Sequence, residues 1–83
     1  MKTVTILKKF GAKKDKYGHY YIPLKVGKLL VNLRDNFLFC NFFGAEKEAI
    51  VKFGHWKQNI MLTGSKEEKE VQVERHLSKL INI

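Results

Sequence analysis

The feature that most constrains the fold is a series of short segments in which apolar and polar residues alternate. Every second side chain is apolar over residues 19–26, and the same alternation continues over residues 29–33. Side chains of a strand point alternately to its two faces, so this pattern predicts half-buried strands. Turn residues at 27–28 and 34–36 separate the segments. Because turns this short join antiparallel neighbours, we expect an antiparallel meander.

Two further segments extend the predicted sheet. Residues 3–10 alternate in the same way and are predicted to form the first strand. Pro23 has no backbone N–H, which places its strand at an edge of the sheet or makes it irregular there. The segment 37–43 is apolar on both faces except for Asn41. That composition is typical of a strand covered on both sides, so we expect its four phenylalanines to belong to the core.

Residues 45–53 are compatible with either a helix or a strand. Ala45, Ala49 and Phe53 share a helical stripe, but the β-branched pair at positions 50–51 favours a strand. A hairpin over residues 49–62 is slightly preferred, because residues 56–62 alternate well. Trp56 would then lie on the apolar face as a core residue, or alternatively border a binding groove.

The C-terminal segment predicts an amphipathic helix over residues 66–81. Ser65 and Glu68 have the spacing of a capping box at its start. Apolar residues then recur at helical spacing from Val73 to Ile81. The chain is therefore expected to be one small basic domain, residues 1–83, of the α+β class. We expect a small twisted antiparallel sheet of five or six strands, an OB- or SH3-like partial barrel, with this helix packed on one face.

The net charge of +8 is unevenly distributed along the chain. Residues 1–35 carry +7 of it and residues 36–83 only +1. A one-sided basic field attracts polyanions, which favours a nucleic-acid partner. Cys40 is the lone cysteine, and no apolar run is long enough for a secretion signal or a membrane span. We therefore expect a cytoplasmic protein without a membrane partner.

A lysine-rich loop that leads into a tyrosine-rich strand is the main candidate binding site. Aromatic faces stack on bases and lysines neutralise phosphates, so Tyr17, His19 and Tyr21 are expected to stack while the cations hold the backbone. Only two arginines are present, which indicates low sequence specificity, and the acidic C-terminal helix argues for single strands over duplex. The predicted nucleic-acid-binding residues are Lys8, Lys9, Lys13, Lys14, Lys16, Tyr17, His19, Tyr21, Lys25, Lys28 and Arg34.

Other functions for the same residues stay open. Tyrosines are common in strands, and lysines around a hairpin keep a sheet edge soluble. The alternative function is a small viral or mobile-element protein that binds and modulates an acidic protein partner. The acidic helix and the basic first half could also complement each other between two copies in a homodimer.

Catalytic and cofactor sites are not predicted. The three histidines and Cys40 lack metal-ligand spacing, and Cys40 lies in the most apolar segment, where a thiol is a small hydrophobe. No glycine-rich phosphate loop is present, and Asp15 and Asp35 are separate turn residues rather than a carboxylate pair. We therefore expect a non-enzymatic protein without a cofactor, a metal or a small-molecule substrate.

Overall fold

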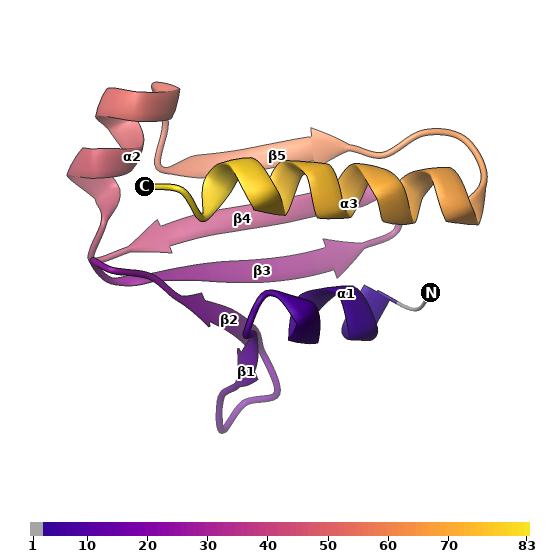
Figure 1. Cartoon of the computed structure of the whole chain (residues 1–83), viewed down its shortest axis with the longest axis horizontal. Coiled ribbons are helices and arrows are strands. Elements are labelled where there is room, and N and C mark those ends of the chain that lie inside the picture. The colour runs from indigo at the N-terminus through magenta and orange to yellow at the C-terminus, as the bar shows by residue number, and fades with distance from the viewer. Residues whose placement is uncertain (1–2) are drawn as a thin grey trace.

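Five antiparallel strands form one sheet, and three helices pack against it (Figure 1). The computed structural model describes residues 3–83. In chain order the elements are α1 (Thr3–Lys9), β1 (Lys13–Lys14), β2 (Tyr20–Pro23), β3 (Lys28–Arg34), β4 (Phe37–Phe43), α2 (Glu46–Phe53), β5 (Lys57–Met61) and α3 (Lys66–Leu80). The predicted α+β class, the small antiparallel sheet and the C-terminal helix are confirmed.

The sheet is open, with its strands side by side in sequence order from β1 to β5. Each strand pairs only with its chain neighbours, so β1 and β5 are the two edges. It therefore lacks the closure expected of an OB- or SH3-like barrel. One physical reason is that β1 has only two residues, and another is that the segment before it is a helix, which leaves too little strand to close the sheet.

The N-terminal segment is a helix, so the prediction of a strand over residues 3–10 was wrong. Ile6 and Leu7 are neighbours in sequence and both are buried. A strand would send them to opposite faces, whereas a helix turns both toward the same core together with Phe10. Packing against the sheet thus outweighs the weak helix propensity of the β-branched residues that open this segment.

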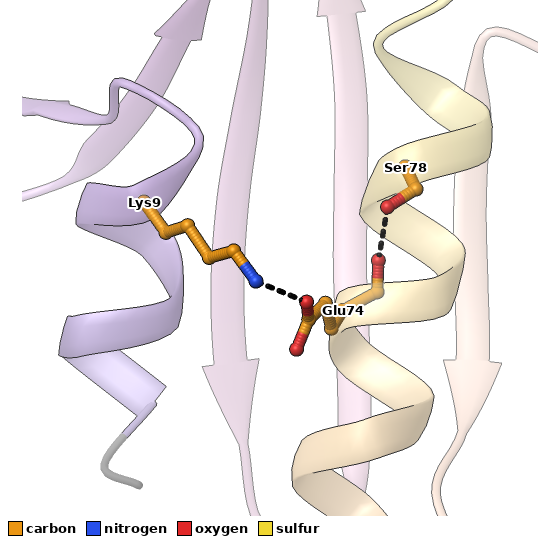
Figure 2. Close-up of polar contacts among 3 residues, drawn as sticks. All are labelled: Lys9, Glu74 and Ser78. Atoms are coloured by element: carbon orange, nitrogen blue, oxygen red, sulfur yellow. Dashed lines mark hydrogen bonds and ion pairs between the residues drawn. The ribbon is translucent and has the colours of Figure 1, made fainter.

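Helix α1 lies beside α3 on the same side of the sheet, as Figure 1 shows. Figure 2 shows the polar contact between them, in which the Lys9 ammonium donates to the Glu74 carboxylate. One turn further along α3, the Ser78 hydroxyl donates to the backbone carbonyl of Glu74 at 2.9 Å. The two helices form one layer, which we call the helical layer.

The segment after β4 is helix α2, so the preferred hairpin over residues 49–62 was wrong. Ala45 and Ala49 are fully buried, and Phe53 stacks on Phe42 with 5.9 Å between ring centroids. This helical stripe closes one end of the core. Gly54, in the left-handed conformation with φ 83°, ends the helix, and its N–H donates to the Ile50 carbonyl. Strand β5 pairs with β4 as a result.

Helix α3 confirms the prediction at the C-terminus. The Ser65 side chain accepts from the Glu68 N–H, and the Glu68 side chain accepts from the Ser65 N–H. Val73, Leu77 and Leu80 are buried against the sheet. No helix within residues 3–83 is both long and apolar enough to cross a membrane.

The core lies between the helical layer and one face of the sheet. The buried strand residues on this face are Ile22, Leu29, Val31, Leu38, Cys40 and Phe42. Burial raises the pKa of the Cys40 thiol to about 12, so this cysteine is an inert core residue. The expectation that β4 is covered on both sides was wrong, because the buried residues of all three helices meet the same sheet face.

Candidate nucleic-acid interface

The second sheet face, which we call the open face, has no helix over it in the described part of the chain. Directly opposed residues of paired strands share a face, so the register shows which side chains lie together. One row crosses all five strands and consists of Lys13, Tyr21, Leu30, Asn41 and Lys57. Each of these residues is exposed or half-buried. The open face is thus a continuous surface made of strands alone.

Aromatic rings are a main component of the open face. Phe37 is 37% exposed and Phe43 is 42% exposed, while Phe39 and Tyr21 are half-buried. The rings of Phe37 and Phe39 lie 5.9 Å apart, centroid to centroid, at an interplanar angle of 30°. Rings held in a sheet with one side toward solvent can stack on flat ligands.

Four cations lie among these rings. Lys13, Lys28, Arg34 and Lys57 project from the same face, and the Lys28 ammonium is 5.1 Å from the centroid of the Tyr21 ring. No strand residue on this face, among residues 3–83, is Asp or Glu. All six glutamates of the chain lie instead on α2 and α3. The strand residues of the open face therefore carry positive charge alone, whereas the helices carry charges of both signs.

The loop between β1 and β2 is held by Asp15. Its carboxylate accepts from the backbone N–H of Tyr17 at 2.8 Å and from that of His19 at 2.9 Å. The bond from His19 is the main cause that lowers the pKa of Asp15, and the bond from Tyr17 acts in the same direction. Tyr17 is 73% exposed at the loop tip, with the Lys16 ammonium 5.1 Å from its ring centroid. The loop thus presents a ring and a cation beside the sheet.

The predicted binding residues are distributed over five places. Tyr21, Lys13, Lys28 and Arg34 lie on the open face, whereas Lys16, Tyr17 and His19 belong to the adjoining loop. Lys14 is on the opposite side of β1, 5.7 Å from the ring centroid of Tyr20, and Lys25 lies in the turn between β2 and β3. Lys8 and Lys9 belong to α1 in the helical layer, where Lys9 already contacts Glu74 (Figure 2).

Sequence reasoning missed the phenylalanines and Lys57 on this face. The sequence of β4 carries no signal for this, because its residues are apolar on both faces except for Asn41. In the structure its even-numbered residues from Leu38 to Phe42 are buried while Phe37 and Phe43 are not. The buried residues of the three helices all belong to the single core on the other sheet face. The second aromatic face of β4 therefore remained uncovered.

A hollow of about 680 Å³ lies at one margin of the open face. Strand β2 pairs with β3 only as far as Val31, so the last three residues of β3 have no strand beside them on that side. The hollow lies where β2 gives way to the loop. Its lining comprises Leu7, Gly18, His19, Tyr20, Leu30, Val31, Asn32, Leu33, Arg34, Phe39 and Asn41.

The chemistry of the open face is stacking and charge attraction. Within residues 3–83, no three His, Cys, Asp or Glu side chains gather as metal ligands would. The side chains available on the face are aromatic, aliphatic, amide and cationic. Comparison with known proteins finds no matching family model, no matching curated sequence and no matching solved structure.

Proposed function

We propose that this protein binds single-stranded nucleic acid on its open face and carries out no catalysis. One observation supports this above all: an uncovered sheet face combines aromatic rings with cations and carries no acidic residue among its described strands. The rings supply stacking, which contributes about 1–3 kcal/mol per base and tolerates any sequence. The cations supply contacts to phosphates.

The geometry favours a single strand over a duplex. In a duplex the bases stack on each other, so their faces are not available to Tyr21 or Phe39. Duplex readers usually insert a basic helix or ribbon into a groove. The longest helix here, α3, carries four glutamates. Five strands spaced about 4.8 Å apart give a surface roughly 19 Å wide, enough to contact several unpaired nucleotides.

The test is fluorescence anisotropy with labelled 12-nucleotide single-stranded DNA, single-stranded RNA and a duplex DNA of the same length. Four phosphate contacts by the open-face cations predict a slope of log K against log salt of about −3. Affinity should therefore fall roughly 50-fold between 50 and 200 mM salt. Duplex DNA should bind more weakly than either single strand.

Matched variants test whether binding depends on the open face or on the helical layer. Tyr21→Ala combined with Phe39→Ala removes two rings from the open face and should abolish measurable binding at 200 mM salt. Lys8→Ala in α1 removes a cation from the helical layer and should leave binding unchanged. No binding to any single strand at 50 mM salt would contradict the proposal.

A second candidate function is binding of an acidic protein partner through the same face. Met61 is 62% exposed and lies on β5 directly opposite Phe37, so the face has apolar contact area near its cations. Such a mixture is also typical of protein interfaces. A second copy of this chain is one such partner, and light scattering of the purified protein would detect the homodimer. A protein partner predicts a few concentrated hot-spot residues and no affinity for bare oligonucleotides.

A cytoplasmic location belongs to the same proposal. Cys40 is an unpaired thiol, as expected of a protein kept in a reducing compartment.

A further inference from the structure

We infer that the hollow beside β3 is a subsite for one unpaired purine base, which gives the open face a base preference within otherwise non-specific binding. The inference rests on the proposed function, because the base must arrive as part of a bound single strand. It concerns the side chains of Asn32, Arg34 and Asn41, which lie in the hollow.

The position of the hollow suits a base that leaves the stack. It adjoins Phe39 and Leu30 on the open face and continues around the edge of β3, where β2 has ended. A base stacked over Phe39 can therefore be followed by one that enters the hollow at the margin of the sheet. The volume of about 680 Å³ lies within the range of about 300–1,000 Å³ that small-molecule sites occupy.

Three polar side chains of the hollow have no partner among the described residues, unlike His19, whose Nδ1 lies 3.9 Å from the Asp15 carboxylate. Among residues 3–83, no hydrogen bond or ion pair involves the side chains of Asn32, Arg34 or Asn41. Asn41 is half-buried, so the sheet already limits the hydrogen bonds that water can make to its side-chain amide. A ligand that bonds this amide would take the place of those water contacts. These three side chains are available to a ligand as they stand.

The two asparagine side chains match a base better than an anion. Each asparagine amide offers both donors and an acceptor, whereas a phosphate or a carboxylate needs donors only. A base edge displays donors and acceptors side by side, which matches an amide. The apolar wall made by Leu30 and the Phe39 ring accommodates the flat faces of the same ligand.

The same groups select purines over pyrimidines. Asparagine reads the N6 and N7 atoms of adenine with two hydrogen bonds, and arginine reads the O6 and N7 atoms of guanine in the same way. Both pairings use N7, which pyrimidines lack. Asn32 and Arg34 lie two residues apart on the same face of β3, so either partner can meet the edge of a purine held in the hollow.

The experiment uses four labelled 12-nucleotide DNA strands: all-thymidine, and all-thymidine with one central adenine, guanine or 7-deazaguanine. One bidentate contact predicts that a single adenine or guanine tightens Kd about fivefold or more over all-thymidine. The 7-deazaguanine strand lacks the N7 acceptor and should bind about as weakly as all-thymidine.

Variants assign the preference to the hollow. Asn32→Ala should remove the adenine preference and keep the all-thymidine Kd within about twofold. Asn59→Ala is the matched control, because Asn59 lies on the same face opposite Phe39 but outside the hollow, and it should keep the preference. Circular dichroism of both variants establishes that they are folded.

Each outcome decides one of the two proposals. If all four strands bind equally well, the purine subsite is wrong while single-strand binding stands. If the preference survives both Asn32→Ala and Asn41→Ala, or is equally strong for 7-deazaguanine, stacking accounts for it and the hollow is not a base site. If no strand binds at 50 mM salt, the proposed function itself fails.

Discussion

The two faces of the sheet differ in what covers them: helices bury one, and the other is exposed to solvent. On the inner face Phe42 is completely buried against the helices, whereas its neighbour Phe43 is 42% exposed on the open face. Both residues belong to β4 and follow the same alternation. The comparison shows that a strand's sequence determines which residues share a face, while the helices determine which face becomes the core. Substitutions at the even-numbered residues of β4 should therefore change stability, and substitutions at its odd-numbered residues should change ligand binding.

The largest effect is expected from removing an aromatic ring on each face in turn. Phe42→Ala leaves a cavity beneath α2, where Phe53 stacks on this ring, and should lower the free energy of unfolding by about 3–5 kcal/mol. Phe43→Ala should cost less than about 1 kcal/mol and weaken binding to single-stranded DNA instead. Urea denaturation and anisotropy measure the two quantities. Equal destabilisation by both variants would show that the open face is covered in solution.

The backbone at one end of the sheet offers a second test, since both faces depend on it. Gly27 has φ 71°, and a Cβ built there would lie 2.1 Å from the carbonyl oxygen of Phe43. Gly27→Ala should therefore cost at least about 2 kcal/mol of unfolding free energy, from the left-handed backbone and the overlap together. Gly27→Ala should also weaken binding to single-stranded DNA, because Lys28 and Phe43 lie at this end of the open face.

Gly11→Ala is the matched control for that variant. Gly11 has a similar φ of 80°, but a Cβ there would have no atom within 4 Å. Its cost should be only the left-handed penalty of about 1 kcal/mol. Should the two alanine variants prove equally stable by urea denaturation, the close approach of Gly27 to β4 would not hold in solution.

The electrostatic difference between the faces predicts a change in binding without a change in stability. Lys28→Ala with Lys57→Ala removes two cations from the open face and should reduce the salt slope for single-stranded DNA by about 1.4. Lys47→Ala with Lys66→Ala makes the same change of net charge on α2 and α3 and should leave the slope unaltered. Anisotropy over 50–200 mM salt compares the pairs. Equal slopes for both would mean that net charge alone, and no particular face, attracts the ligand.

Much of the fold could be predicted where its cause is local. The capping box of Ser65 and Glu68 lies within one helical turn, and the prediction of α3 was confirmed. The strand over residues 37–43 was also predicted with its bounds, because a short apolar run that follows turn residues is a local signal. Helix α1 was not predicted, because the burial of both Ile6 and Leu7 depends on a sheet and on α3.

The candidate site was predictable in part for the same reason. Lysines and tyrosines near one another in sequence pointed to Tyr21, and the structure places this ring next to Lys28 on the open face. Phe39 and Lys57 belong to the same surface but come from β4 and β5, so only the strand pairing joins them to Tyr21. Which face lacks helices depends on contacts far apart in the sequence, and alternation carries no information about it.

The smallest expected effect is a pH dependence that belongs to the helical layer alone. Burial, and then the positive charges of Arg75 and Lys79, lower the pKa of His76 below its ordinary value of 6.5. As the pH falls below 6.5 the unfolded chain binds the proton first, so the stability present at higher pH is lost as the pH falls through the folded pKa. Urea denaturation between pH 7.5 and about pH 5 should show a small decline that His76→Gln reduces, whereas His55→Gln keeps it because His76 remains. A decline of equal size in the His76→Gln variant would place the titrating group elsewhere.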